Sequence, residues 1–369
     1  MSPAKRKRLG ADTGSGNRSM KTTHRIFFED SRKMHQVPAH SVDLVVTSPP
    51  YPMVAVWDEM FSGQNPVIKE LLFKNAGWPA FENMHCELDP VWSETFRILK
   101  PGGIACINIG DATRTLGGNF ALYPNHARVL KQMTLIGFTP LPLILWRKQT
   151  NAPNKFMGSG MLPPGAYVTL EHEYILIFRK GEKRRFKSRK EINNRRESSY
   201  FWEERNQWFS DIWTDLKGAP QKLADNRVRG ISAAYPFELP YRLINMFSVK
   251  GDVVADPFLG TGTTMAAAMA GCRNSIGYEI DRHIKEMIHA QLRQIVSFSN
   301  SAITKRIKAH AGFVKKTVPS EKLRYINSHY GFPVVSKQET TILLNPLASV
   351  SQSEENCFVV SYLDHLQID

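Results

Sequence analysis

Residues 47–51 form the sequence TSPPY, in which a serine and a tyrosine flank two prolines. Pro49 and Pro50 remove two backbone N–H donors and fix two φ angles, so the backbone here is stiff. The Ser48 hydroxyl and the Pro49 carbonyl can each accept a hydrogen bond from an amino group, and the Tyr51 ring offers a face for stacking. Together these groups would suit a planar ring that carries an amino group. The alternative for the same residues is a proline-stiffened turn with a surface tyrosine.

A glycine-containing loop follows much later in the chain, within DVVADPFLGTGTT at residues 252–264. A hydrophobic strand is expected to end at Asp256, and a helix of small residues is expected to start near Thr263. Gly260 and Gly262 would let the backbone approach a ligand closely, while the helix N-terminus presents free amides. Within a βαβ unit such a loop binds a cofactor. A glycine turn with a purely structural role fits the loop alone equally well.

Two acidic residues end the next predicted strand, NSIGYEID at residues 274–281. An acid about twenty residues beyond a cofactor loop is placed to bind the ribose hydroxyls of an adenosine-containing cofactor. We expect Glu279 to fill this role, whereas Asp281 could equally cap the following helix. The loop sequence GTGTTM lacks the third glycine of the dinucleotide-binding pattern. This difference disfavours a nicotinamide cofactor, and with it an oxidoreductase.

The elements that must position these groups alternate between strands and helices, which predicts an α/β sheet protein. Strands are expected at residues 24–30, 41–51, 103–111, 141–149, 171–181, 252–256, 274–281, 340–347 and 357–363. Helices are expected at residues 85–103, 125–138, 235–251, 263–271, 282–296 and 303–316.

A strongly basic stretch, RKGEKRRFKSRKEINNRR at residues 179–196, interrupts this alternation, and aromatic residues follow it at 200–213. Interleaved basic and aromatic side chains suit contact with phosphates and with bases or sugars. The alternative is a solvated basic loop over a small apolar subcore built from the tryptophans, and both interpretations can hold in part. The residues expected to contact DNA are Lys183, Arg184, Arg185, Lys187, Arg189, Lys190, Arg195 and Arg196.

The composition of the whole chain limits which classes of protein it can belong to. A net charge of +14 over 369 residues suits a polyanionic partner, most often nucleic acid, or serves solubility alone. The four cysteines lie far apart and form no CxxC pair, so we predict neither a metal site nor disulfides. Without a signal peptide or a membrane-spanning apolar run, a cytoplasmic protein is expected. Residues 1–22, which include the cluster KRKR, are predicted to be a disordered basic tail.

The TSPPY and DPFLGTGTT motifs together resemble those of the amino-group DNA methyltransferases of restriction–modification systems. The resemblance spans about residues 24–292, and the catalytic motif precedes the cofactor loop, as in the β arrangement. The protein-glutamine methyltransferases also carry a PPY motif but place the cofactor loop first, which argues against them. The resemblance implies a Rossmann-like sheet that binds S-adenosyl-L-methionine. It also implies methylation of cytosine N4 or adenine N6 in double-stranded DNA after the base is flipped out.

The resemblance also implies roles for single residues and segments. Ser48, Pro49, Pro50 and Tyr51 match the catalytic motif. The cofactor-binding residues are expected to be Asp30, Pro236, Glu238, Asp256, Phe258, Gly260, Gly262, Thr263 and Glu279. Residues 180–230 occupy the place of an inserted target-recognition region within a catalytic domain at 23–296, and 297–369 would be a C-terminal extension of unknown role.

The serine of SPPY favours cytosine N4, because SPPY is more typical of cytosine-N4 enzymes and DPPY or NPPY of adenine-N6 enzymes. Adenine N6 is the alternative. Methylation at carbon 5 needs a cysteine nucleophile, usually after a proline, and none of the four cysteines follows one. The family further implies a cognate restriction endonuclease as partner and a monomer or homodimer. A non-catalytic DNA-binding module on the same fold and an RNA methyltransferase stay as alternatives.

Overall fold

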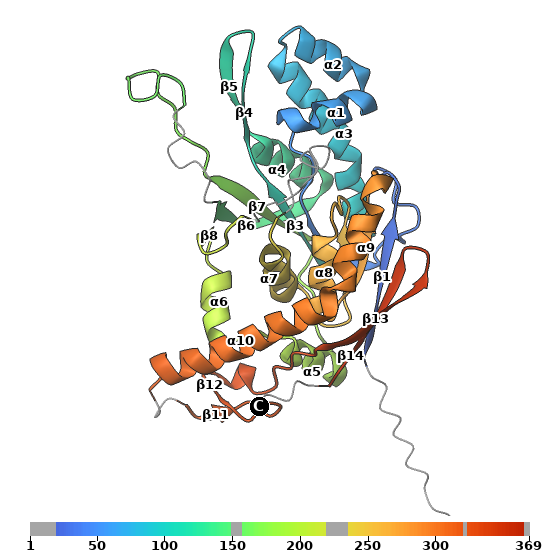
Figure 1. The fold of residues 1–369 in the computed structure, drawn as a ribbon, viewed down its shortest axis with the longest axis vertical. Helices are drawn as coiled ribbons and strands as arrows, with labels where there is room; N and C mark the ends of the chain where they lie inside the picture. Colours follow the sequence, from blue (N-terminus) through green and yellow to red (C-terminus); the bar gives the residue numbers. More distant parts are fainter. Residues whose placement is uncertain (1–19, 149–156, 219–234, 320–322, 365–369) are drawn as a thin grey trace, which may run out of the picture.

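A ten-stranded sheet forms the centre of the computed structural model, which describes residues 20–148, 157–218, 235–319 and 323–364 (Figure 1). Its strands are β1 Lys21–Phe27, β2 Val42–Thr47, β3 Leu99–Ile109, β6 Phe138–Arg147, β7 His172–Lys180, β8 Ile212–Trp213, β9 Val253–Asp256, β10 Asn274–Tyr278, β13 Leu347–Glu354 and β14 Cys357–Tyr362. Their order is β13-β14-β1-β10-β9-β2-β3-β7-β6-β8. The five strands from β1 to β3 in this order run parallel, whereas β7 and β14 run antiparallel to both of their neighbours.

Helices cover both faces of this sheet. The main ones are α3 Gly77–Ile98, α4 Asn125–Ile136, α7 Glu238–Phe247, α8 Thr263–Ala270, α9 Lys285–Arg293 and α10 Ile295–Thr317. Buried residues of α3 and α4 share one core with Val45 of β2, and α7 and α8 share another with Leu44 and Val46. Because β2 is covered on both faces, its sequence is a nearly continuous hydrophobic run.

Smaller elements lie at the two ends of the molecule (Figure 1). At one end are α1 Asp58–Gln64, α2 Pro66–Phe73 and the hairpin of β4 Ala112–Leu116 and β5 Asn119–Tyr123; at the other are α5 Arg189–Glu197 and the pair β11 Tyr325–Ile326 and β12 Pro333–Val334. A short helix, α6 Trp202–Trp208, lies between α5 and β8 in the sequence. Within the described ranges no helix is both long and apolar enough to cross a bilayer.

The N-terminal part confirms most predicted elements and corrects the bounds of several, among them a strand and a helix. Strand β1 begins at Lys21, inside the predicted tail, and Thr22 is buried with its hydroxyl 2.7 Å from that of Tyr362. Residues 1–19 of that tail lie outside the described residues. The helix predicted at 85–103 starts earlier, at Gly77, and ends at Ile98, so that KPGG belongs to β3. The proline is tolerated there because the pairing of β3 with β2 shifts register across this segment.

The C-terminal part is not a separate extension. The boundary predicted at 296/297 falls inside α10, and β13 and β14 continue the sheet beyond β1. The strand predicted at 357–363 is confirmed as β14, whereas the one predicted at 340–347 is wrong, since β13 starts only at Leu347. This hairpin covers the edge that β1 would otherwise expose.

Candidate active site

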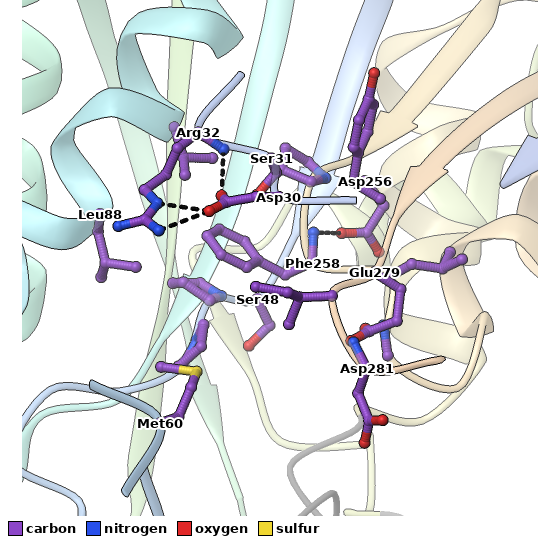
Figure 2. A pocket seen from close by; sticks show the side chains of 18 of the residues that line it. Asp30, Ser31, Arg32, Ser48, Met60, Leu88, Asp256, Phe258, Glu279 and Asp281 are labelled. Atoms are coloured by element: carbon purple, nitrogen blue, oxygen red, sulfur yellow. Dashed lines mark hydrogen bonds and ion pairs between the residues drawn. The ribbon is translucent and has the colours of Figure 1, made fainter. Parts of the chain in front are cut away.

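The carboxyl ends of β2 and β9 lie side by side near the middle of the sheet. From β9 the chain continues through α8 to β10 on one side, and from β2 through α3 to β3 on the other. Ligands of open α/β sheets bind at such a reversal of strand order. A cavity of about 310 Å³ opens there, lined by residues of both strand ends (Figure 2). The two motifs identified in the sequence therefore meet at one site.

Most of the predicted catalytic and cofactor residues line this cavity. They are Asp30, Ser48, Pro49, Pro50, Asp256, Phe258, Gly260, Thr263 and Glu279. Gly262, Tyr51, Pro236 and Glu238 are not among the lining residues. Gly262 lies just behind the wall as the N-cap of α8, and Tyr51 lies beside Ser48.

The loop between β9 and α8 needs its glycines for backbone reasons. Gly260 and Gly262 have φ values of 53° and 87°, in the left-handed region that favours glycine. The Gly260 amide donates to Glu279 Oε2 at 2.9 Å. A Cβ at Gly262 would lie 3.2 Å from Ile288 Cγ2, so the loop also packs closely on α9. Both glycines thus hold the loop in the shape that forms one wall of the cavity.

Asp256 fastens this loop to β2. It is almost fully buried, and its Oδ1 accepts hydrogen bonds from the Thr47 hydroxyl at 2.5 Å and the Phe258 amide at 3.0 Å. Its Oδ2 accepts from the Thr264 hydroxyl at 2.6 Å. Burial raises the pKa of Asp256 above its ordinary value even though these donors oppose the shift. The main role of this carboxylate is therefore structural, because it links the ends of β2 and β9.

Glu279 directly follows β10 and lines the cavity beside the glycine loop (Figure 2). Its two oxygens accept one backbone amide each, from Gly260 at 2.9 Å and from Asp281 at 2.8 Å. Each carboxylate oxygen can accept a further bond, so capacity remains for hydroxyl donors. Burial raises the pKa of Glu279. Asp281 accepts from the His283 amide and so caps the following turn, which was the alternative predicted for it.

Asp30 follows β1 and lies at a third wall of the cavity (Figure 2). Arg32 donates to it through its side chain, at 2.6 Å from Nη2, and through its backbone amide at 2.9 Å. Burial opposes ionisation of Asp30, but these contacts with Arg32 outweigh it and lower the pKa of the carboxyl group. Arg32 also donates to Glu87 of α3 at 2.5 Å, so the pair is fixed from two elements.

The TSPPY motif places a hydroxyl and a phenol close together. Ser48 Oγ lies 3.1 Å from the Tyr51 hydroxyl. The Tyr51 ring packs against Gly110, where an added Cβ would lie 3.0 Å from Cε2 of the ring. The Tyr51 side chain is therefore partly buried, unlike the surface tyrosine of the alternative interpretation. Burial is the largest cause of its strongly raised pKa.

Two predicted cofactor residues lie outside the cavity, and their neighbour Tyr235 lines it instead. Glu238 begins α7 and pairs with Arg242 at 3.1 Å, while the Pro236 carbonyl accepts the Leu239 amide in the turn before that helix. The buried Tyr235 hydroxyl bonds with the Thr264 hydroxyl and lies 3.4 Å from Asp256. The sequence signal for Tyr235 was its place as the first residue of YPFELP.

Several apolar lining residues come from segments that carry no motif. Trp57 and Met60 lie around the start of α1, and Leu88 and Val91 come from α3. Their helical spacing predicts a buried face without indicating that the face borders a ligand site.

The basic segment does not reach this site. Arg184 bonds Asp252 at 2.6 Å and lies 3.5 Å from Asp43, and these two acids stand at the amino ends of β9 and β2. Ser48 lies five positions after Asp43, which is about 16 Å along a strand. Arg184 and Arg195 also lie over the Phe186 ring. The segment thus lies at the end of the sheet opposite the cavity, which does not support contact with DNA around the target base.

The aromatic residues that follow the basic segment form the subcore of the alternative prediction. Phe201, Trp208 and Trp213 are almost fully buried. Trp202 and Phe209 are 46% and 40% exposed. Of the predicted target-recognition region at 180–230, residues 219–230 lie outside the described residues.

Comparison with known proteins identifies the family. A family model described as DNA methylase, covering enzymes that methylate N6 or N4 amino groups, matches residues 42–290. The chain therefore belongs to the N6/N4 DNA methylase family, as its motifs predicted. The predicted cofactor is confirmed at the level of this family, which depends on S-adenosyl-L-methionine. The chain is accordingly a DNA methyltransferase that modifies an amino group.

Two curated relatives cover most of the chain. It is 52% identical over 344 residues to the Type II methyltransferase M.MthZI of Methanothermobacter thermautotrophicus, covering 93% of this chain and 96% of the relative. It is 50% identical over 288 residues to the Type II methyltransferase M.MjaI of Methanocaldococcus jannaschii, covering 73% and 91%.

A solved structure is similar in fold. The putative DNA modification methylase TTHA0409 of Thermus thermophilus, determined in complex with S-adenosyl-L-methionine, is 32% identical with a TM-score of 0.57, covering 74% of this chain and 95% of that chain. The predicted fold class, a Rossmann-like methyltransferase sheet, is thus confirmed.

Proposed function

We propose that this DNA methyltransferase methylates the exocyclic N4 of cytosine in duplex DNA. The observation that carries the proposal is the position of SPPY: Ser48 lines the cavity directly beyond β2, next to the glycine loop of β9. A hydroxyl at this point can accept a hydrogen bond from an exocyclic amino group. The serine favours cytosine because SPPY is more typical of cytosine-N4 enzymes than of adenine-N6 enzymes.

Three walls of the cavity fit the cofactor. We assign Glu279 to the ribose, since its carboxylate retains acceptor capacity beyond its two amide bonds. Asp30 suits the adenine side, and the loop with Phe258 and Gly260 suits the methionine side. When bound, S-adenosyl-L-methionine would supply an electrophilic methyl group that an amino nitrogen can take by direct displacement. S-adenosylhomocysteine would be the leaving group, and the methylated nitrogen would then lose one proton.

The chain itself contributes orientation and electrostatics. The target base leaves the duplex stack at a cost of a few kcal/mol and stacks on Tyr51 in the proposed complex. Ser48 and the Pro49 carbonyl then each accept one hydrogen bond from the amino group, which turns the nitrogen lone pair toward the cofactor. Two acceptors also stabilise the positive charge that develops on this nitrogen. Holding the reactants in this geometry supplies most of the rate gain, and no covalent enzyme intermediate is needed.

We further propose that the enzyme is the modification component of a restriction–modification system, with a cognate endonuclease acting on the same site. Its similarity to two Type II methyltransferases over most of their length supports this role. The enzyme would act as a monomer or homodimer.

Methyl transfer from labelled S-adenosyl-L-methionine to duplex DNA tests the proposal, with the product digested to nucleosides and separated by mass spectrometry. We expect N4-methylcytosine. N6-methyladenine would keep the fold, the cofactor and the family but overturn the choice of base. Label in RNA alone would overturn the duplex substrate, and bound cofactor without any transfer would indicate a silent DNA-binding module.

A further inference from the structure

A partly buried polar network lies directly behind Ser48. The Tyr51 hydroxyl donates to Glu173 Oε2 at 3.0 Å, and Asn108 Nδ2 donates to the Tyr51 oxygen at 2.9 Å and to Glu173 Oε2 at 2.7 Å. Lys148 Nζ pairs with the other oxygen of Glu173 at 2.9 Å. The partners come from β3, from the start of β7 and from the residue after β6. None of these three residues belongs to a motif found in the sequence.

The chemistry of these groups fixes the direction of the hydrogen bonds. A carboxylate only accepts, so the single Tyr51 hydroxyl hydrogen points at Glu173. The Tyr51 oxygen, which already accepts from Asn108, can then only accept from Ser48, whose oxygen lies 3.1 Å away. Burial, followed by the nearby Glu173 carboxylate, raises the pKa of Tyr51 well above its ordinary value, so the phenol keeps its proton.

The direction matters at Ser48, because its own hydrogen is committed to Tyr51. Both lone pairs of the Ser48 oxygen are then available to the cavity that Ser48 lines. If these hydrogen bonds ran in the opposite direction, from Tyr51 to Ser48, the Ser48 hydrogen would point into the cavity. It would then repel the hydrogens of an amino group.

The orientation of Asn108 supports the same direction. Its side chain is buried, and in the described part of the chain no group bonds to its Oδ1. Rotating the amide would bring Oδ1 to within 2.7 Å of Glu173 Oε2, where two acceptors repel. A buried acceptor left without a partner costs stability, and the two hydrogen bonds that the Asn108 amide donates to Tyr51 and Glu173 offset this cost.

We propose that Glu173 is a positioning residue for methyl transfer: through Tyr51 it turns Ser48 into an obligatory acceptor for the amino group of the target base. Lys148 pairs with the carboxylate, and hydrogen bonds linked in series strengthen one another in this partly buried setting. The inference rests on the proposed role of Ser48 but holds equally for cytosine and adenine, since both present an exocyclic amino group.

Glu173→Gln tests the proposal without changing the shape of the side chain. A glutamine cannot accept from Tyr51 and from Lys148 at once, because one of its ends carries two donors. We expect kcat to fall by about 10²-fold, the size of effect that loss of reactant positioning produces, with KM for S-adenosyl-L-methionine unchanged. The matched control is Glu171→Gln, which removes an exposed partner of Arg147 two residues away and should leave kcat unchanged.

The decisive readout is the combination with Ser48→Ala. If Glu173 acts through Ser48, the double variant is no slower than Ser48→Ala alone, because the group to be oriented is already absent. The proposal would be overturned if the losses of kcat in the two single variants multiplied in the double variant, or if kcat fell equally in the Glu171→Gln control. Either result would indicate a merely structural carboxylate. Full activity of Ser48→Ala alone would instead refute the role of Ser48 in the proposed function, and Glu173→Gln at wild-type rate would refute only the positioning role.

Discussion

The two ends of the central sheet are both rich in charged and polar groups, but they use them differently. At the amino ends of β2 and β9, Asp43 pairs with Lys100 at 2.8 Å and Asp252 pairs with Arg184 at 2.6 Å. At the carboxyl ends, Ser48 and Glu279 border an open cavity and keep acceptor capacity. At the amino ends these two acids are paired within the chain, whereas at the carboxyl ends Ser48 and Glu279 keep acceptors available for a ligand.

The contrast shows why the density of charge in a sequence is a poor guide to a site. The basic segment at 179–196 is the most highly charged stretch of the chain, yet it packs at the amino end with two of its arginines over Phe186. The site lies where polar groups converge on a cavity at the reversal of strand order.

The largest effect is expected at the carboxyl end, for Ser48→Ala. Losing one preorganised hydrogen-bonding group at a developing charge costs about 10²- to 10³-fold in turnover. Affinity for S-adenosyl-L-methionine should stay near the wild-type value, because the cofactor contacts come from other walls. Single-turnover kinetics alongside calorimetric cofactor binding measures both quantities. A variant that kept full turnover would contradict the assigned role.

Gly260→Val should weaken the cofactor site by straining the loop. A β-branched residue at a φ of 53° costs at least about 1–2 kcal/mol, equivalent to roughly tenfold or more in affinity if the loop shifts. Gly251→Val is the matched control, because Gly251 has a φ of 81° but lies at the amino end of the sheet. It should lower the melting temperature while cofactor affinity stays unchanged. Equal losses of affinity in both variants would erase the proposed difference between the ends.

Glu279 gives the site a pH dependence whose sign follows from its raised pKa. The ionised carboxylate accepts ribose hydroxyls, so affinity should fall as the pH drops from neutrality through the raised pKa. Glu279→Gln should bind the cofactor about tenfold more weakly, the loss expected for a hydrogen bond to a charged group, and independently of pH in this range. Calorimetric titrations at several pH values measure this. An unchanged pH dependence in the variant would assign the titration to another group.

The smallest effect is expected for a triple substitution on α5, R189S/K190S/R196S. These side chains are exposed at the end of the sheet away from the cavity. We expect little change in KM for duplex DNA and in its dependence on salt, because neutralising phosphates requires contact. A clear fall in the salt dependence would show that DNA wraps to the amino end and would restore the interpretation of this segment as a DNA contact.

The sequence predicted the centre of the site because its motifs are local. TSPPY and DPFLGTGTT each combine a strand end with a special backbone, and strand ends of a parallel sheet meet at one edge. The direction of β7 could not be predicted in the same way, since hydrophobic patterning is the same for either orientation of a strand. Because β7 is antiparallel, it begins behind Ser48, where Glu173 lies, and ends at the far end of the sheet, where the basic segment follows.

Hydrogen-exchange mass spectrometry tests the contrast between the two ends most directly. The protein would be saturated with S-adenosylhomocysteine and compared with and without a duplex that carries a site located by the methylation assay. We expect DNA to slow exchange around residues 48–64 at the carboxyl end and to leave exchange in residues 183–197 unchanged. Protection of residues 183–197 without protection around Ser48 would contradict it.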